Sequence, residues 1–321
     1  MKIKLLTLNE IKSSGIFSSY STSIFNRYDW LQIFNPYIKI LGIYDDGDNL
    51  IGNFFLYKEK KFSLNLYRNP PYTPLIGPFF KVDARNPVNI LNKYREVLSL
   101  MADFLDKLNY SIISVSLGRN IVDTLPFIWK KFKVVPGYTY CLDLNKSLDE
   151  LNKGMSVKRR NNITKGIRDK LTAKKVEDFS LVKLLVLRNF SRQGKVVSEY
   201  YLDKILFGFA NDSNSFAFAA FREEKPIAVA FCVYDKTTAY YLLGGYDNEY
   251  KHHGAGALAV WEAIKHSKRL GLRYFDFEGS MIPQIEKYFR GFGGELTPYF
   301  RVNKAKLPLE ILLKFYRREL F

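Results

Sequence analysis

The sequence predicts an α+β fold built from two similar halves, and three observations carry this prediction. First, one order of elements occurs twice: helices, a set of antiparallel strands, then helix, strand, helix and strand. Second, a length of 321 residues fits two domains of about 150 residues each. Third, hydrophobic residues make up 47% of the chain and aromatic residues 16%, which supplies the apolar surface for sizeable cores. We place the two domains at residues 1–142 and 143–321.

The first half opens with a strand near residue 1 and continues with a hairpin at 39–62, where alternating apolar residues flank the turn signal DDGDN. A proline-rich loop covers residues 67–80. Apolar residues at helical spacing then predict a helix at 92–108. A buried strand at 111–117, a short helix at 125–132 and a strand at 138–144 complete this half.

The second half opens with a basic helical stretch at 147–171, followed by helices at 180–193 and 198–210. Three strands at 215–221, 226–234 and 238–246 are joined by the turns REEK and DKT. The next helix runs to Leu270, where Gly271 is a stop signal. The last elements are a buried strand at 272–279, a helix at 283–294, a strand at 295–303 and an amphipathic helix at 307–320.

The net charge of +17 predicts an anionic partner, such as a nucleotide, nucleic acid, anionic lipid or phosphorylated substrate. No run of 18 or more apolar residues occurs, so we expect no membrane span, while peripheral membrane contact remains compatible with the charge. The N-terminal stretch has the pattern of a strand and not of a secretory signal. Cys141 and Cys232 lie far apart in apolar segments, which indicates buried thiols and a cytoplasmic location.

Four stretches carry a family resemblance. Residues 138–171 hold a strand, a DL step and a basic helix with the pattern K-x-R-x-x-I, and the loop at 67–80 ends in IGPFF. Residues 240–280 hold a glycine-containing loop, a helix and a strand ending in DFEGS, and KYFRGFGG follows. In this order they resemble the Fem-type proteins, tandem members of the Gcn5-related N-acyltransferase (GNAT) superfamily that include peptidoglycan bridge aminoacyltransferases. The resemblance implies two GNAT-like domains, each a mixed central sheet flanked by helices.

The stretch KHHGAG, residues 251–256, follows a strand and precedes a helix. Its form K-x-x-G-x-G resembles the Q/R-x-x-G-x-G/A loop of acetyl-coenzyme A enzymes in this superfamily. Glycines let the backbone approach a pyrophosphate, and a helix N-terminus offers free N–H groups. We therefore expect Lys251, Gly254 and Gly256 to form an anion cradle, with a plain strand-to-helix turn as the alternative.

A metal site on the histidines is not expected. His252 and His253 are adjacent and point different ways, and His266 is too far along the helix to complete a ligand set. His253 could act as a general base, but an exposed loop histidine is the simpler interpretation. Chemistry by these histidines is therefore the least favoured interpretation of the loop.

Two glycines and a tyrosine end the strand at 238–246. Within the GNAT resemblance, this strand splays from its neighbour and its backbone receives the acyl donor, which implies donor contacts at Gly244 and Gly245. Glycine inside a strand agrees with close backbone approach and equally with a bulge. We assign substrate contact to the following residue, Tyr246.

The excess positive charge is most concentrated in the basic helical stretch. From Lys153 to Lys175, nine residues are basic and only Asp169 is acidic among the titratable ones. An apolar stripe of Ile163, Ile167 and Leu171 predicts one buried side, with Arg160 pointing inward and Lys158 and Lys165 outward. Arg160 and Lys158 are expected to recognise phosphate or RNA, and a solvated basic face is the alternative.

Asp276 and Glu278 fall on one face of a strand that otherwise looks buried. Two carboxylates there are costly unless they are paired or functional. Glu278, at the strand's end, is the first candidate for binding or deprotonating the acceptor amine. Pairing with an arginine or capping of the next helix is the alternative.

The stretch KYFRGFGG places Phe289 where simple acetyltransferases of the fold often carry a tyrosine that protonates the departing thiolate. Tyr288 lies one residue away, on a different helix face. Arg290 stands where Fem-type enzymes carry lysine, and a cation there could stabilise an oxyanion. An exposed helix-end arginine is the alternative for Arg290, and Phe289 is assigned to substrate contact.

We therefore expect an N-acyltransferase that moves an acyl or aminoacyl group to a primary amine. The donor is acyl-coenzyme A or aminoacyl-tRNA, used as a co-substrate, with no tightly bound cofactor and no metal. By resemblance only, the acceptor belongs to a cell-wall or surface-sugar precursor. The first half lacks a K/R-x-x-G-x-G loop and is expected to be degenerate. A peptidoglycan bridge aminoacyltransferase and a non-catalytic RNA-binding protein that uses the basic helix are the alternatives.

Overall fold

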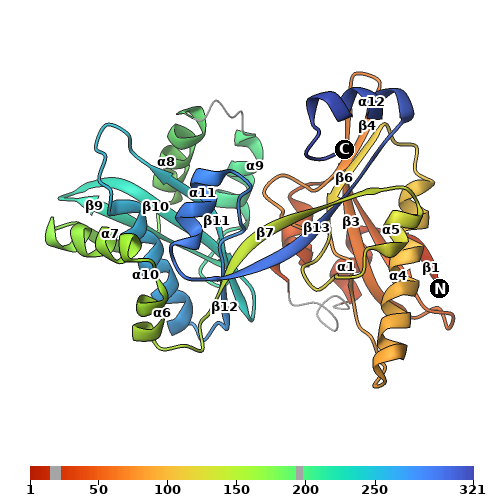
Figure 1. The fold of residues 1–321 in the computed structure, drawn as a ribbon, viewed down its shortest axis with the longest axis horizontal. Helices are drawn as coiled ribbons and strands as arrows, with labels where there is room; N and C mark the ends of the chain where they lie inside the picture. The colour runs from red at the N-terminus through yellow and green to blue at the C-terminus, as the bar shows by residue number, and fades with distance from the viewer. Residues whose placement is uncertain (15–22, 193–197) are drawn as a thin grey trace. The chain divides into compact units, whose positions relative to one another are not determined.

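The computed structural model describes residues 1–14, 23–192 and 198–321 (Figure 1). The elements of the first half are β1 (Lys2–Leu6), α1 (Leu8–Ser14), η1 (Ile24–Asn26), α3 (Tyr28–Gln32), β2 (Ile38–Tyr44), β3 (Leu50–Lys61), β4 (Leu64–Arg68), β5 (Phe79–Phe80), α4 (Pro87–Asp106), β6 (Ile112–Ser116), α5 (Leu125–Trp129) and β7 (Lys133–Asp143). The predicted elements are present in the predicted order, and α1, η1, α3, β4 and β5 occur in addition to them.

The second half repeats this order after two short helices, of which the second is strongly basic. Its elements are α6 (Leu148–Gly154), α7 (Val157–Arg168), β8 (Thr172–Val176), α8 (Phe179–Arg192), α9 (Glu199–Asp203), η2 (Lys204–Phe209), β9 (Ser215–Arg222), β10 (Lys225–Tyr234), β11 (Thr238–Tyr246), α10 (Ala255–Arg269), β12 (Tyr274–Asp276), α11 (Pro283–Arg290), β13 (Glu295–Ala305) and α12 (Leu307–Tyr316). The predicted end of one helix at residue 193 lies outside the described residues.

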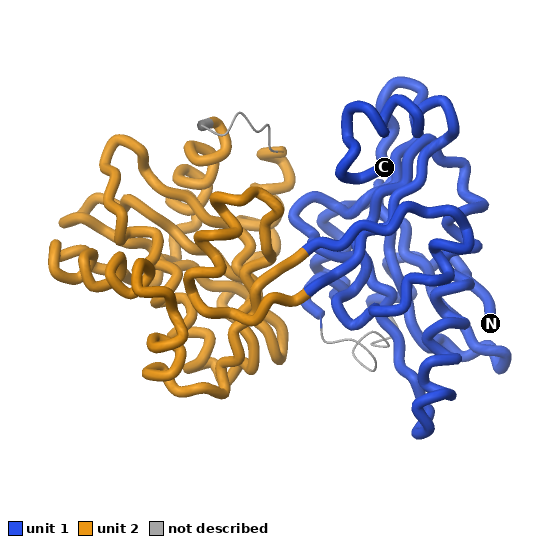
Figure 2. Tube along the Cα trace, viewed as in Figure 1, with its two compact units in different colours: residues 1–137, 298–321 blue, residues 138–297 orange. Residues whose placement is uncertain are grey.

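The chain forms two compact units that are not the two contiguous halves (Figure 2). Unit 1 comprises residues 1–137 and 298–321, and unit 2 comprises residues 138–297. Strand pairing explains the difference from a boundary at residue 142. The end of β7 pairs with β12 inside unit 2, and the end of β13 pairs with β6 inside unit 1. Each unit therefore contains the closing strand of the other half.

In unit 1 the strand order is β1-β2-β3-β4-β6-β13, with β4 and β6 parallel and the other pairs antiparallel. Its long helix, α4, begins at Pro87, five residues before the predicted start. The side chain of Asn86 caps it by accepting from the N–H groups of Val88 and Asn89. The cap occupies the first amides of α4, so α4 does not begin with a glycine-led N-terminus.

In unit 2 the strand order is β7-β12-β11-β10-β9-β8. The strand β8 was not predicted, because its sequence TAKKV looks like a continuation of the basic helix. That basic stretch is two helices, since Ser156 in extended conformation ends one segment and caps α7 by accepting from Arg159 N–H. The predicted strand at 272–279 is also shorter, because β12 ends at Asp276.

None of the helices in the described parts of the chain has the length and apolar character needed to cross a membrane.

Candidate functional site

The strands β11 and β12 pair only briefly in the unit 2 sheet. These strands pair in parallel for three residues only, from Thr238 opposite Tyr274 to Tyr240 opposite Asp276. On its other side, β11 stays paired with β10 as far as Tyr246. β12 ends at Asp276, so the part of β11 from Tyr241 to Tyr246 has no pairing with β12. This part of β11 is where the GNAT resemblance implies a splay that receives the donor.

Aromatic rings pack where the two strands separate. Tyr241 is the first residue of β11 beyond the pairing, and Phe277 follows β12. Their ring centroids lie 6.4 Å apart, and Phe289 of α11 lies 5.8 Å from Tyr241 and 5.4 Å from Phe277. Phe289 thus packs with unit 2's own rings but is only half-buried, so part of its surface stays open to contact.

The glycine loop leads into α10, whose N-cap residue is Gly254. A Cβ at Gly254 would collide with the carbonyl oxygen of Asn162 and lie 2.8 Å from the backbone nitrogen of Gly166, both in α7. Close packing of α7 on α10 therefore requires glycine here. A phosphate is not needed to explain this residue.

His252 fastens the same loop. Its Nδ1 accepts a hydrogen bond from Gly254 N–H at 3.0 Å, and its Nε2 lies 3.0 Å from Oδ2 of Asp169 at the end of α7. Because Nδ1 accepts, the neutral ring carries its proton on Nε2 and donates it to Asp169. This hydrogen bond lowers the pKa of Asp169. The histidine is structural, and it occupies one amide of the predicted cradle.

Gly256 is in a different position from Gly254. The nearest atom to a Cβ built there is the hydroxyl oxygen of Tyr288, at 3.2 Å, and no backbone atom obstructs it. Burial raises the pKa of Tyr288 to about 12, so its phenol stays protonated at neutral pH. Lys251 is exposed just before this turn. The first turn of α10 thus presents Gly256, the phenol of Tyr288 and a nearby cation.

The glycines of β11 are explained by packing. A Cβ at Gly245 would lie 2.5 Å from the backbone of Leu185 and 2.8 Å from that of Val186, both in α8, and one at Gly244 would collide with the hydroxyl of Tyr241. Tyr246 is half-buried against the core of unit 2. The close approach that requires glycine in β11 is therefore explained by the protein's own side chains and helices, without a bound donor.

The inward arginine of α7 is Arg159, so the prediction that Arg160 points inward is wrong. Arg159 is 5% exposed, whereas Arg160 is half-buried and donates to the carbonyl groups of Lys153 and Met155. The helix buries positions 159, 163 and 166, which shifts its buried face and leaves Ile167 61% exposed. Lys158 and Lys165 are exposed, as predicted.

Arg159 is held by rings and a carbonyl group instead of a carboxylate. Its Nη2 donates to the carbonyl oxygen of Tyr288 at 2.9 Å, and its guanidinium carbon lies 3.9 Å from the Tyr288 ring centroid and 4.7 Å from that of Phe292. Its Nε is buried with no hydrogen-bond partner among the described residues. Burial lowers its pKa from the ordinary arginine value.

The two carboxylates have different environments. Asp276 is buried and its Oδ1 accepts from the Thr139 hydroxyl at 2.6 Å and from Glu278 N–H at 2.9 Å. It therefore shapes the turn after β12. Glu278 lies beyond the strand with φ of 58°, so strand alternation does not place it on the face of Asp276, contrary to the prediction. A non-glycine residue held in this conformation stores strain, which is typical of functional sites.

Arg290 is 60% exposed in its side chain and forms an ion pair with Glu286, Nε to Oε1 2.9 Å. The same oxygen accepts from the hydroxyl of Tyr140 at 2.5 Å. Burial and this hydrogen bond raise the pKa of Tyr140. This geometry favours the alternative interpretation of Arg290 as a helix-end arginine.

The sequence did not indicate the roles of Arg159 and Tyr288, nor the latch, by which we mean the hydrogen bonds of His252 with Gly254 N–H and Asp169. The period of α7 could have indicated Arg159 once Gly166 was counted as a buried position. Across the residues described, no group of three or more His, Cys, Asp or Glu side chains could hold a metal ion. Cys232 is fully buried, which raises the pKa of its thiol well above the ordinary value and makes it a poor nucleophile.

Comparison with known proteins bears on the fold. Residues 194–290 match the acetyltransferase (GNAT) domain family. The structure is similar to that of FemX, with a TM-score of 0.67 and 14% identity over 98% of this chain and 100% of that one. It is also similar to L-PGS from Bacillus licheniformis (TM-score 0.55, 12% identity, 97% and 96% covered) and to a tandem GNAT protein from the clavulanic acid biosynthesis pathway (TM-score 0.56, 11% identity, 94% and 98% covered).

Among curated proteins, none matches the sequence. At these identities the structural similarities establish the fold, and the chain has a tandem GNAT fold.

Proposed function

We propose that this tandem-GNAT chain transfers an acyl or aminoacyl group to a primary amine, with the donor bound at unit 2. The observation that carries the proposal is the separation of β11 from β12 beside the first turn of α10. Both elements lie within the residues that match the acetyltransferase domain family. In unit 1 the corresponding helix is capped by Asn86, which supports a donor site in unit 2 only.

Transfer proceeds by direct attack in a ternary complex. The acceptor amine attacks the acyl carbon, a C–N bond forms, and the bond from that carbon to the donor sulfur or oxygen breaks. The amine must lose a proton and the leaving group must gain one. Glu278 is the candidate base, and the protonated phenol of Tyr288 is a candidate donor to the leaving group. A covalent intermediate on Cys232 is disfavoured because its thiol is buried.

Aminoacyl-tRNA is the favoured donor. A thioester arm between the strands would have to displace the rings of Tyr241, Phe277 and Phe289, and Gly254 N–H already serves His252. The exposed side of α7 carries Lys158, Lys165 and Arg168, which suits a phosphate backbone. The Fem-type resemblance agrees with this donor and favours an amine on a cell-wall or surface-sugar precursor.

Acyl-coenzyme A is the second candidate donor. The loop from Lys251 to Gly256 supports it, because Gly256 leaves the first turn of α10 open to a pyrophosphate and Lys251 supplies a cation. For this donor the aromatic rings must rotate on binding.

Two measurements on the whole chain separate the donors. The affinity for aminoacyl-tRNA, measured by filter binding, should fall as salt rises. In the double variant Lys158→Glu/Lys165→Glu this affinity should fall about fivefold or more, where a tenfold change corresponds to about 1.4 kcal/mol. Thermal shift with coenzyme A and its thioesters should be small. A clear stabilisation by a thioester that disappears in Lys251→Glu would reverse the order of the two donors.

A transfer assay distinguishes the acyltransferase from a non-catalytic RNA-binding protein. If the chain is an acyltransferase, transfer of a labelled aminoacyl group to an amine acceptor should be lost in Glu278→Gln, while RNA binding persists. If no acyl transfer from either donor is found with a panel of amines, and RNA binding is tight, the acyltransferase proposal fails. Gly254→Val is unsuitable here, because it would collide with α7.

A further inference from the structure

The C-terminal helix α12 exposes nearly all of its apolar residues. It follows β13 in unit 1 and is drawn dark blue in Figure 1. Its sequence is LPLEILLKFY, and none of its residues is buried. Leu307 is 73% exposed, Phe315 82% and Tyr316 77%. Scattered apolar residues are normal on a surface, but a whole exposed helix of them marks an interaction site.

The apolar residues face away from unit 1. The exposed positions Leu307, Ile311 and Phe315 recur at a spacing of four, and Leu312 and Tyr316 form a second such row beside them. The half-buried positions are Leu309, Glu310 and Leu313. A surface helix of a globular protein has its apolar stripe toward the core. In α12 the most exposed stripe is apolar.

Basic residues surround this stripe. Residues 304–319 contain five lysines and arginines and two glutamates. Each glutamate is paired within the segment, Glu310 with Lys314 at 2.8 Å and Glu319 with Arg317 at 2.6 Å. Lys306 and Arg318, which flank the helix, form no ion pair within the described part of the chain. An apolar face bordered by cations that have no carboxylate partner is typical of a helix that lies in a membrane interface.

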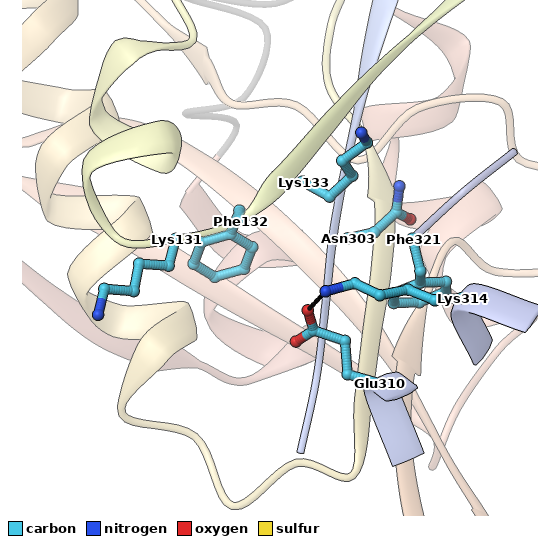
Figure 3. Close-up of a pocket in the computed structure, with 7 residues that line it drawn as sticks. All are labelled: Lys131, Phe132, Lys133, Asn303, Glu310, Lys314 and Phe321. Atoms are coloured by element: carbon cyan, nitrogen blue, oxygen red, sulfur yellow. Dashed lines mark ion pairs between the residues drawn. The ribbon is translucent and has the colours of Figure 1, made fainter. Parts of the chain in front are cut away.

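A pocket lies behind α12, with a volume of about 310 Å³ (Figure 3). It is lined by Lys131, Phe132, Lys133, Asn303, Glu310, Lys314 and Phe321. Asn303 is fully buried: its Oδ1 accepts from the Ser114 hydroxyl at 2.7 Å, and its Nδ2 has no partner among the residues described. Figure 3 shows this nitrogen and the Lys133 ammonium pointing to the same side.

The ammonium group of Lys133 is exposed and forms no ion pair within the described residues, so the pocket offers a cation to an anionic group. The carboxylate in the lining, Glu310, is already paired with Lys314.

We propose that α12 docks on an anionic phospholipid bilayer, with its apolar stripe in the interface and a lipid phosphate in the pocket behind it. Charge complementarity favours this occupant over a second copy of the chain. Two copies would bring together basic segments of a protein that carries a net charge of +17. An anionic bilayer accepts both the apolar stripe and the cations. The proposal does not depend on the acyltransferase activity.

The test is cosedimentation of the whole chain with vesicles of equal parts phosphatidylglycerol and phosphatidylcholine, compared with pure phosphatidylcholine. We expect binding to the anionic vesicles that weakens as salt rises. Ile311→Ser/Phe315→Ser should lower the affinity at least about tenfold, because burial of one such side chain is worth that much. Phe62→Ser is the matched control: Phe62 is 98% exposed in the turn after β3, and its loss should have no effect.

Two further variants test the cations and the pocket. Lys306→Glu/Arg318→Glu and Lys133→Ser should each weaken binding to anionic vesicles about fivefold or more, with no change in circular dichroism. Unchanged affinity in Lys133→Ser would remove the pocket from the proposal. Equal binding to both kinds of vesicle, no sedimentation at all, or wild-type affinity in Ile311→Ser/Phe315→Ser would overturn it. If the wild-type chain is a dimer and Ile311→Ser/Phe315→Ser is a monomer, the apolar stripe serves self-association instead.

Discussion

Replacing Gly254 by alanine tests the claim that this glycine serves packing before ligand binding. The added methyl group would meet the carbonyl oxygen of Asn162 and the backbone nitrogen of Gly166. Both are backbone atoms of α7, so only a shift of α7 relative to α10 relieves the collision. Overpacking of this kind costs about 1–3 kcal/mol, and alanine is also a poorer N-cap than glycine. We expect the free energy of unfolding to fall by about 2–4 kcal/mol.

Gly256→Ala is the matched control two residues away. A methyl group there meets only the hydroxyl of Tyr288, at 3.2 Å, and position 256 is inside α10. Alanine is about 1 kcal/mol better than glycine within a helix. The stability of unit 2 should therefore stay the same or rise slightly.

Thermal unfolding followed by circular dichroism separates the two variants. For a unit of roughly 160 residues, each kcal/mol moves the midpoint by about 2–4 °C. Gly254→Ala should lower the midpoint by about 4–16 °C, and Gly256→Ala should not. A Gly254→Ala protein that unfolds at the wild-type temperature would refute the packing argument and restore the phosphate cradle as the reason for this glycine.

Other predictions concern buried or latched groups. Arg159→Met should keep the free energy of unfolding, measured in urea, within about 1 kcal/mol of wild type. The buried guanidinium has no carboxylate partner within the described residues to offset the cost of its desolvation. A larger loss would show that its contacts with the Tyr288 carbonyl group and the aromatic rings outweigh that cost. Asp169 has a lowered folded-state pKa, so its contribution is present above its unfolded value of about 3.9 and is lost as pH falls through the folded value. Melting temperature should therefore drop more steeply below pH 4 in wild type than in Asp169→Asn, and parallel curves would contradict the latch. Iodoacetamide at pH 8 should leave Cys232 unmodified until unfolding, with Cys141 as the internal comparison by mass spectrometry.

Local patterns predicted most of the fold. The hairpin of β2 and β3, the meander of β9 to β11 and the helix α10 follow from alternation, turn residues and the stop at Gly271. The strand β8 was missed because Lys174 and Lys175 give it no apolar face of its own, and its place at the edge of the unit 2 sheet depends on pairing with β9. The exchange of β7 and β13 between the two units could not be predicted either, because no residue within a strand specifies which half of the chain supplies its partner.

The candidate site was less predictable, because the same residue types serve packing and binding. Gly254 belongs to a stretch with the spacing of a ligand loop, and Gly245 lies in the strand expected to contact the donor, yet each is required by a neighbouring helix. The choice between Arg159 and Arg160 depends on a rotation of α7 by one residue, and α7 is held in place by its close packing against Gly254 of α10. Such contacts between distant segments leave no periodic signal in the sequence.

The exchanged strands also set the order in which the protein can be completed during synthesis. Unit 1 needs residues 298–321, so its sheet stays open after the first 137 residues have left the ribosome. At about 5–20 residues per second, the roughly 160 residues of unit 2 take on the order of 10–30 seconds to make. Throughout that interval β6 exposes the edge that β13 will fill. The nascent chain must be protected there, and unit 2 can finish folding first.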